Sequence, residues 1–294
     1  MDYDLIIIGS GPGGYVAAIR ASQLKMKTAV IEKAEIGGIC LNWGCIPTKS
    51  LLKSSQVFDY MNHASDYGIK IDGSVKADFN AIIERSRSVA DSMSKGVSFL
   101  FRKNKIDLVN GTGKLAGKNS VEVMDTGGEV KTYTARNIIL ATGARSKELP
   151  GLKQDGKKII GYREAMTLDK QPDSMVVVGS GAIGSEFACF YQSIGTDVTL
   201  VEFLPRIVPN EDEEVSKQLE RSFRKMNMKV LTDSQVESTD ASGGKCKVRI
   251  KAKDGFKEVE TDIVFSAVGI TPNIEGLGLE EAGVEIEKGK IGVD

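Results

Sequence analysis

The sequence predicts an α/β protein with two Rossmann-like, doubly wound domains that carry small antiparallel β-meander insertions. Three observations support this fold class: a glycine-rich unit occurs twice, a similar apolar strand follows each copy, and 294 residues exceed what one hydrophobic core usually supports. We place the first domain at 1–147, with a return segment at 272–294, and the second domain at 148–271.

Residues 5–32 and 175–202 follow the same plan. Each consists of an apolar run, a GxGxxG turn, a helical stretch, a second apolar run and a glutamate. Equivalent positions keep a constant offset in numbering, with Gly9, Gly11, Gly14 and Glu32 recurring as Gly179, Gly181, Gly184 and Glu202. Agreement over a whole βαβ unit indicates an internal duplication.

The chemistry of a GxGxxG turn predicts its ligand. The first glycine permits a tight turn, the second lets a pyrophosphate approach the backbone, and the third lets helix and strand pack closely. The anion then lies at a helix N-terminus, and the glutamate that ends the next strand can accept hydrogen bonds from a ribose diol. A solvated acid at a strand end is the alternative reading. One such motif is weak evidence, but two copies in context predict two dinucleotide sites.

The remaining elements follow from hydrophobic periodicity. Short apolar runs at 137–143 and 262–269 predict a closing strand for each unit, and the polar, glycine-punctuated stretches at 106–135 and 229–261 predict antiparallel meanders. We expect helices at 47–61, 78–103 and 211–226. The last of these would place Val215, Leu219, Phe223 and Met226 on one packed face.

Cys40 and Cys45 lie in the most distinctive segment, GGICLNWGCIPTKS at 37–50. On a regular helix this spacing would hold the two cysteines too far apart to bridge, so the backbone must be irregular there, and Gly44 and Pro47 provide for it. Cysteines at a helix opening gain thiolate character, which suits a redox pair.

A structural disulfide and half of a zinc site are the alternatives for these cysteines. Zinc would need two further ligands, and Cys189, Cys246 and the single histidine, His63, show no ligand spacing. We therefore expect no metal and a redox-active pair.

Charge and hydropathy exclude several partners. With 39 basic and 40 acidic residues and no long block of one sign, nothing indicates nucleic acid or an anionic membrane as a partner. No apolar run reaches the roughly 18 residues of a membrane span, and the first strand begins too close to Met1 for a cleavable signal. We expect a cytoplasmic protein, or a mitochondrial matrix protein if the source is eukaryotic.

The segments IIIGSGPGG, CLNWGCIPTKS, NIILATGA, VVVGSGAIGSEFA and SAVGITPN, in this order, resemble the pyridine nucleotide-disulfide oxidoreductases, and within them the branch that oxidises dihydrolipoamide. The resemblance covers the whole chain. It implies that Cys45 lies beside a flavin and that Cys40 exchanges with the substrate. It also implies that Lys49, one helical turn after Cys45, lies near flavin N5 and pairs with Glu186.

The same resemblance makes the first domain FAD-binding and the second NAD-binding. It extends the glycine-turn contacts, so that FAD would contact Gly9, Gly11, Pro12, Gly13, Gly14, Glu32, Lys33, Gly38, Lys49, Gly113, Ala141, Thr142 and Gly143, and NAD would contact Gly179, Gly181, Ala182, Ile183, Gly184, Glu202 and Gly269. A carboxylate at Glu202 would repel a 2′-phosphate, which favours NAD over NADP.

The activity implied by the resemblance is the oxidation of protein-bound dihydrolipoamide, with electrons passing through the cysteine pair and FAD to NAD. The partner would be the lipoyl carrier of a 2-oxo acid dehydrogenase or glycine cleavage complex. Two alternatives stay open: a disulfide reductase of the glutathione or mercuric type, and a non-catalytic flavoprotein or docking module.

Members of this family continue beyond the length of this chain, with further FAD contacts and a dimerisation domain that carries a catalytic histidine and its glutamate partner. The sequence stops at Asp294, and His63 lies in no segment that resembles this base. We therefore expect weak flavin retention, very low lipoamide turnover and a predominantly monomeric chain in place of the homodimer of the family.

Overall fold

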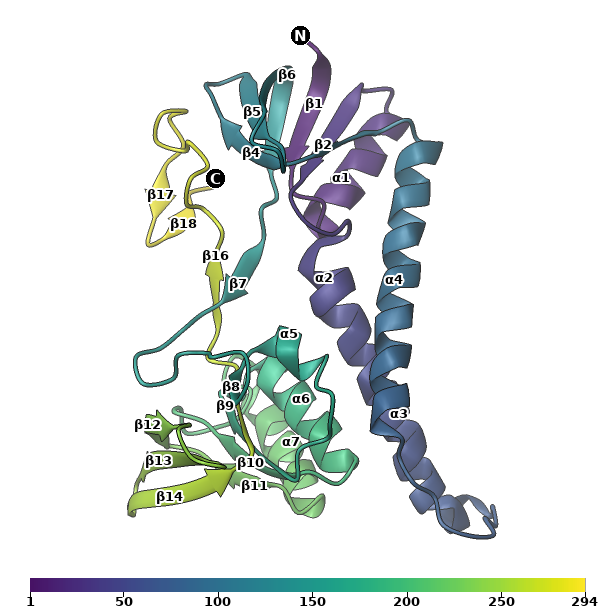
Figure 1. The fold of residues 1–294 in the computed structure, drawn as a ribbon, viewed down its shortest axis with the longest axis vertical. Helices are drawn as coiled ribbons and strands as arrows, with labels where there is room; N and C mark the ends of the chain where they lie inside the picture. Colours follow the sequence, from purple (N-terminus) through teal and green to yellow (C-terminus); the bar gives the residue numbers. More distant parts are fainter. Residues whose placement is uncertain (294) are drawn as a thin grey trace. The chain divides into compact units, whose positions relative to one another are not determined.

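The computed structural model describes residues 1–293, and Figure 1 shows its elements. The chain forms two compact units: the first consists of Met1–Ile46, Ser88–Arg145 and Thr271–Asp294, and the second of Pro47–Arg87 and Ser146–Ile270. Residues 47–87 thus belong to the second unit, although the boundaries drawn from the sequence put them in the first domain. Those boundaries stay a prediction.

The first unit is built on a six-stranded sheet with the order β3-β2-β1-β6-β5-β4. The strands are β1 (Tyr3–Ile8), β2 (Thr28–Glu32), β3 (Asp107–Asn110), β4 (Thr112–Leu115), β5 (Ser120–Met124) and β6 (Val130–Leu140). Strand β1 pairs in parallel with β2 and β6, and β6 continues past it to pair with β5 in antiparallel fashion. One long strand therefore joins the nucleotide-type sheet to the meander.

Both faces of β1 are buried, as a central parallel strand requires. Leu5 and Ile7 belong to one apolar cluster, with side chains from α1 (Pro12–Gln23) and α4 (Phe79–Lys103). Ile6 and Ile8 alternate to the opposite face, where they join the meander and the return segment in a second cluster. The helix α2 (Gly38–Trp43) and the start of α3 (Cys45–Asn62) follow β2.

The second unit is built on a five-stranded sheet with the order β11-β10-β9-β15-β8. Its elements are β8 (Ile159–Ile160), α5 (Tyr162–Ala165), β9 (Ser174–Val178), α6 (Ala182–Ser193), β10 (Asp197–Val201), α7 (Glu213–Lys225), β11 (Lys229–Leu231) and β15 (Ile263–Ser266). A separate meander contains β12 (Gln235–Asp240), β13 (Cys246–Ala252) and β14 (Gly255–Thr261). Short elements complete the chain: η1 (Ala64–Tyr67), β7 (Ala144–Ser146), β16 (Ile270–Pro272), β17 (Ile286–Glu287) and β18 (Lys290–Ile291).

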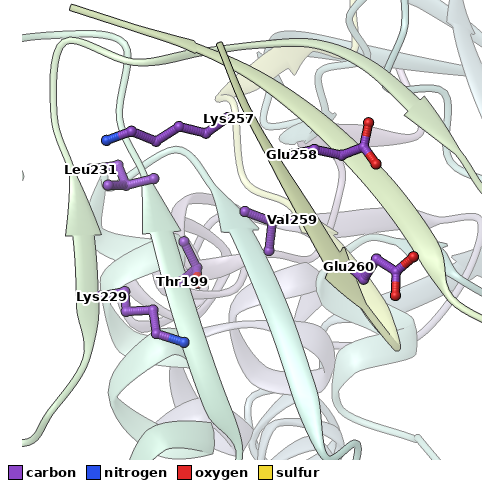
Figure 2. Close-up of a pocket in the computed structure, with 7 residues that line it drawn as sticks. All are labelled: Thr199, Lys229, Leu231, Lys257, Glu258, Val259 and Glu260. Atoms are coloured by element: carbon purple, nitrogen blue, oxygen red, sulfur yellow. The ribbon is translucent and has the colours of Figure 1, made fainter. Parts of the chain in front are cut away.

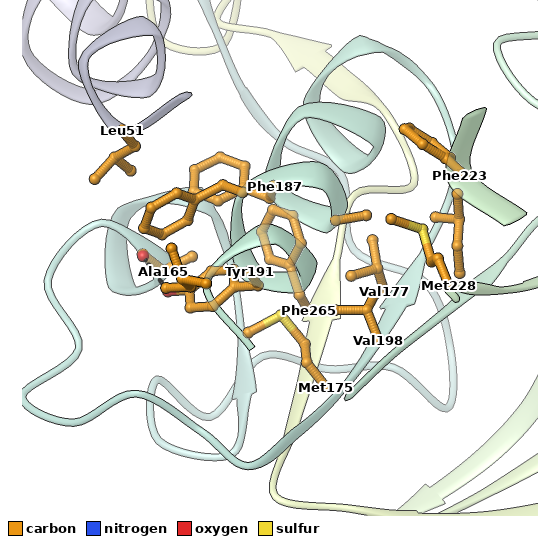
Figure 3. Packing of buried hydrophobic residues seen from close by; sticks show 14 of the residues in the cluster. Leu51, Ala165, Met175, Val177, Phe187, Tyr191, Val198, Phe223, Met228 and Phe265 are labelled. Atoms are coloured by element: carbon orange, nitrogen blue, oxygen red, sulfur yellow. Dashed lines mark hydrogen bonds between the residues drawn. The ribbon is translucent and has the colours of Figure 1, made fainter. Parts of the chain in front are cut away.

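A large aromatic core fills the helical face of the second sheet (Figure 3). Phe187 and Tyr191 from α6 pack there with Phe265 from β15, and Leu51 from α3 joins them. Burial of each such side chain stabilises the fold by about 1.5–3 kcal/mol. The buried hydroxyl of Tyr191 donates to the Ala165 carbonyl oxygen at 2.6 Å, so the core leaves no unmet polar group at this position.

The duplication is visible in the strand order. The series β3-β2-β1-β6 in the first unit matches β11-β10-β9-β15 in the second. In both, the direction of strand addition reverses beside the first strand, and ligands of open α/β sheets bind beyond the carboxyl ends of the strands at such a point. The predicted fold class is confirmed, and both glycine turns lie at this position.

Two predicted details differ. Residues 107–110 and 229–231, expected in the meanders, are the parallel strands β3 and β11, because each pairs with the strand that ends in the glutamate. In α7 the packed stripe contains Ser216 and Phe223, whereas Val215 is 52% exposed. The N-cap Asp212 fixes the start of the helix, and this phase turns Val215 to solvent.

Candidate functional site

The first and third glycines of each turn are required by the packing of the chain itself. Gly9 has φ +103, and a Cβ there would overlap the Ala141 carbonyl oxygen, while a Cβ on Gly14 would overlap the Gly9 carbonyl. The second turn repeats this geometry at Gly179 and Gly184. These glycines therefore hold strand, turn and helix in close contact.

The second glycine of each turn has no such internal reason. Gly11 and Gly181 both have φ −64, a backbone that any residue adopts, and a Cβ at either position would meet nothing within 4 Å. The open space lies directly before the first residues of α1 and α6, Pro12 and Ala182. The pyrophosphate predicted for each turn would lie in this space, because a helix N-terminus offers unpaired amides and the positive end of the dipole.

Each glutamate at a strand end is buried and bonded to its own glycine turn. One carboxylate oxygen of Glu32 accepts hydrogen bonds from Ser10 N (2.9 Å) and Ser10 Oγ (2.6 Å), and the other accepts from Ala34 N (2.9 Å). Glu202 repeats this pattern with Ser180 N at 2.8 Å, Ser180 Oγ at 2.6 Å and Leu204 N at 2.8 Å. A carboxylate offers about four lone-pair sites, so capacity for a ribose hydroxyl remains.

The two serines were missed in the sequence, although a signal was present. In both copies a serine follows the first glycine, and both serine side chains are fully buried. A buried hydroxyl needs a partner, and the glutamate that ends the neighbouring strand provides it. Ser10 and Ser180 thus orient the carboxylates that the motif predicts.

The cysteine segment is irregular at the predicted position. Cys40 lies in the first turn of α2, and Cys45 is the first residue of α3. Gly44 separates the helices, and a Cβ there would come within 3.1 Å of the Ile39 carbonyl oxygen. Cys45 is exposed and Cys40 is half-buried. Their pairing in a disulfide stays a prediction.

Asn42 holds α2 in place and was not singled out in the sequence. Its side-chain amide donates to the carbonyl oxygens of Ile36 and Gly38, both at 2.9 Å. Its oxygen accepts from Ser94 Oγ on α4, also at 2.9 Å. A short helix has little stability of its own, so these three bonds fix the position of Cys40.

Lys49 and Glu186 lie together in the second unit. The lysine Nζ and the glutamate Oε1 are 2.5 Å apart, and the two side chains are 62% and 30% exposed. Exposed ion pairs contribute only about 0–1 kcal/mol to stability. Lys49 follows Cys45 by one turn in the same helix, and the role in catalysis expected for the pair stays a prediction.

The turn after β6 is fastened to the return segment. Thr142 Oγ1 donates to the Asn273 carbonyl oxygen at 2.7 Å, and the Asn273 side chain donates to the Thr142 carbonyl oxygen at 3.0 Å. Arg145 pairs with Glu275 at 2.7 Å, and its hydrogen bond lowers the pKa of Glu275 to about 2. The Thr142 hydroxyl thus fixes the turn, and the contact of this turn with FAD stays a prediction.

The other predicted contact residues differ in their surroundings. A Cβ on Gly113 would press on Ile8 and Ile31, so this glycine serves the packing of the sheet. Open, exposed positions are Gly13, Lys33, Gly143, Ile183 and Gly269, while Gly38 lies directly against Gly11.

The remaining cysteines and the histidine lie apart from these features. Cys189 is on α6 and Cys246 on β13, and burial raises the pKa of both thiols, which makes them poor nucleophiles. His63 directly follows α3, with a ring nitrogen 2.9 Å from the Asp59 carbonyl oxygen. A helix rises 1.5 Å per residue, which puts His63 roughly 27 Å along α3 from Cys45.

A cavity of about 630 Å³ lies elsewhere in the second unit (Figure 2). It is lined by Thr199, Lys229, Leu231, Lys257, Glu258, Val259 and Glu260. Lys229 and Lys257 are bonded to Asp197 and Asp254, so their charges are already compensated. None of the predicted site residues lines this cavity.

Within residues 1–293, no group of three or more His, Cys, Asp or Glu side chains is arranged to hold a metal ion. In the same part of the chain, no helix combines the length and the apolarity that a membrane crossing needs.

A family model described as pyridine nucleotide-disulphide oxidoreductase matches residues 3–294. The chain belongs to this family. The resemblance seen in the sequence is thereby confirmed. The fold of the chain is also similar to a crystal structure of LpdA from Mycobacterium tuberculosis, with a TM-score of 0.88 and 28% identity over 97% of this chain and 62% of that one.

Two curated relatives of the chain carry the name dihydrolipoyl dehydrogenase. The one from Rhizobium etli is 47% identical and matches 99% of this chain and 64% of its own length. The one from Zymomonas mobilis is 44% identical and matches 99% and 63%. The chain therefore spans somewhat less than two thirds of the length of these relatives.

Proposed function

We propose that this chain contributes the two nucleotide sites and the redox cysteine pair of a dihydrolipoyl dehydrogenase. The observation that carries the proposal is the open space at Gly11 and Gly181, beside a buried carboxylate in each unit. The packing of the chain does not require glycine at these two positions, whereas the close approach of a dinucleotide pyrophosphate would require it at both. The names of the relatives support dihydrolipoyl groups as the substrate.

FAD would occupy the first site and NAD the second, and these groups would supply the flavin and hydride chemistry. Gly11 and the α1 N-terminus would face the FAD pyrophosphate, with Glu32 at its ribose. Gly181 and Glu202 would serve NAD in the same way. The cysteine segment lies against the first turn, since Gly38 contacts Gly11, which supports the assignment of the flavin to this copy.

The cysteine pair would exchange a disulfide with the substrate. A dihydrolipoyl thiolate attacks Cys40, the Cys40–Cys45 bond breaks, and Cys45 leaves as a thiolate. The second lipoyl thiolate then attacks the lipoyl sulfur of the mixed disulfide, which closes the lipoyl ring and releases Cys40. Two electrons pass from the substrate to the chain, and the substrate thiols give up two protons. Cys45, the exposed first residue of α3, is the sulfur that leaves in this step.

Lys49 and Glu186 would place a fixed positive charge on the same helix face as Cys45. The carboxylate holds the ammonium group, which would otherwise sample many rotamers. The partner that this chemistry requires is a protein that carries a lipoyl group. We assign the chain to the cytoplasm.

Reconstitution with FAD tests the proposal. The purified chain is titrated with FAD at equilibrium, and it is then examined for reactive thiols before and after reduction by NADH and for NADH oxidation with an artificial acceptor. We expect FAD binding, two rapidly reacting thiols per chain that appear only on reduction, and NADH oxidation. Cys40→Ser and Cys45→Ser should each remove one of the two thiols and leave the other reactive without reduction. Failure to bind FAD, or rapid thiols at Cys189 or Cys246, would contradict it.

A further inference from the structure

The two glycine turns differ in what their buried serine contacts. In each unit the serine after the first glycine donates its amide and hydroxyl to the glutamate that ends the neighbouring strand. The side chain of Ser10 has one more hydrogen-bond partner, which lies on the segment that carries the cysteines. Ser10 Oγ accepts a hydrogen bond from the backbone amide of Gly37, at 3.1 Å and in a buried environment.

At Ser180 the contacts beyond the glutamate are different. Its backbone carbonyl accepts from Val208 N at 3.0 Å and from Ser185 Oγ at 2.9 Å. The second unit, as far as the structure describes it, has no counterpart of the bond from Gly37 to Ser10. The extra bond therefore belongs to the copy that carries the cysteines.

Gly37 lies where the cysteine helix begins. It is the N-cap of α2, with φ +93, and the next residue, Gly38, is so close that a Cβ there would be 2.8 Å from the Gly11 Cα. A hydroxyl that donates to Glu32 still has lone pairs with which to accept from Gly37. The result is a continuous, buried chain of hydrogen bonds from the Gly37 amide through the Ser10 hydroxyl to the Glu32 carboxylate.

Gly37 and Cys40 lie less than one helical turn apart, in a segment that Asn42 holds together. Asn42 ties both the Ile36 and the Gly38 carbonyls to the same side chain. Hydrogen bonds in a buried chain strengthen one another, so a group bound at the carboxylate end affects the amide end.

We propose that Ser10 is a positioning residue that couples occupation of the first nucleotide site to the conformation of the Cys40 helix. A ribose held by Glu32 fixes the carboxylate, the carboxylate fixes the Ser10 hydroxyl, and Ser10 fixes Gly37 at the start of α2. The inference rests on the proposed function, since it needs a ribose at Glu32. It adds that the nucleotide orders the dithiol from the adenosine end, in addition to any effect of the flavin ring.

ADP separates this coupling from shielding by the flavin, because it has the ribose and the pyrophosphate but no isoalloxazine ring. The full chain is reduced, freed of nucleotide, and alkylated with and without saturating ADP, and the modification rates of Cys40 and Cys45 are followed by peptide mass mapping. Variants are Ser10→Ala and the matched control Ser180→Ala, which removes an equally buried hydroxyl from the other unit.

In the unmodified chain ADP should slow Cys40 alkylation by about fivefold or more, the lower end of ordinary coupling between sites. Ser10→Ala should reduce this ratio to about one while ADP still binds, whereas Ser180→Ala should preserve it. A ratio that survives in Ser10→Ala, or that disappears equally in Ser180→Ala, overturns the inference.

Hydrogen exchange in the unmodified chain gives a second measurement that does not depend on a variant that folds. ADP should protect the amides of residues 35–43, and unchanged exchange there would also overturn the inference. Binding of FAD is measured on the same samples by visible absorbance. FAD that binds while ADP leaves Cys40 unaffected refutes only the role of Ser10, whereas a chain that binds neither FAD nor ADP refutes the proposed function as well.

Discussion

Glu202 is hydrogen-bonded to its own glycine turn, and we propose that it also binds a ribose. It is only 7% exposed and already accepts from Ser180 and Leu204. The predicted ribose contact therefore uses the remaining capacity of a carboxylate that the protein has already oriented.

Glu202→Gln should narrow the preference for NADH over NADPH. The change keeps the shape of the side chain but removes the charge that would repel a 2′-phosphate and weakens the bond to the ribose diol. We expect the ratio of the two dissociation constants to fall by about tenfold, which corresponds to about 1.4 kcal/mol. Fluorescence titration measures both constants. Glu32→Gln is the control, and equal preference in the unmodified chain would contradict the argument.

Lys49→Met should leave folding nearly unchanged and still impair electron transfer. The side chain is largely exposed and its ion pair with Glu186 contributes at most about 1 kcal/mol. Glu186→Gln should have the same effect, and the double variant should be no worse than either single one, because the two groups act as a unit. Thermal unfolding and NADH oxidation by the flavin-loaded chain measure the two effects. Additive losses would argue for separate roles.

Single site residues could be predicted from the sequence where a motif fixes the residue type. They could not be predicted where the hydrogen-bond partner lies far away in the chain. Glu32 and Glu202 could be found because they end strands at set intervals after a glycine turn. The bond between Thr142 and Asn273 could not, because its members are far apart in the chain and meet only in the folded protein.

In each glycine turn, the first glycine is required for folding, and the second leaves space for a ligand. Gly9 has a left-handed backbone beside the Ala141 carbonyl, whereas Gly11 has an ordinary backbone and faces open space. The GxGxxG pattern predicted three roles for three glycines, and the structure distinguishes the roles by what a Cβ would meet. The short helix α2 was not predicted, because six residues after two glycines have no periodicity to recognise.

Gly9→Ala and Gly11→Ala should therefore have opposite effects. We expect Gly9→Ala to destabilise the first unit by about 3 kcal/mol or more through backbone strain and overlap. Gly11→Ala should cost less than about 1 kcal/mol, the usual effect at an N-cap, yet should greatly weaken FAD binding. Chemical denaturation and flavin titration distinguish the two. A Gly11→Ala chain that binds FAD normally would show that its open space is not a ligand site.

Over the whole molecule, the chain passes between its two compact units four times, within α3, α4, β7 and β16. Hydrophobic periodicity predicted both sheets, because each copy carries its own strands in sequence. It did not assign residues 47–87 to the second unit, because this depends on packing of Leu51, Phe79 and Ile83 against α6 and its neighbours. Such packing leaves no local signal.

The attachment of the return segment should weaken in acid. Arg145 lowers the pKa of Glu275 to about 2 from its usual 4.5. Because the folded value is the lower one, the pair stabilises the segment fully above about pH 4.5 and loses this contribution as the pH falls through about 2. Hydrogen exchange at residues 271–276, corrected for intrinsic rates, should rise over that range. Glu275→Gln should remove the pH dependence and Glu280→Gln should not.

The central claim is that FAD occupies the first glycine turn and a nicotinamide dinucleotide the second. The most direct test measures bound FAD by visible absorbance and bound NADH by fluorescence in Gly11→Ala and Gly181→Ala, side by side. We expect Gly11→Ala to lose FAD and keep NADH, and Gly181→Ala to lose NADH and keep FAD. Loss of FAD in Gly181→Ala together with its retention in Gly11→Ala would contradict it.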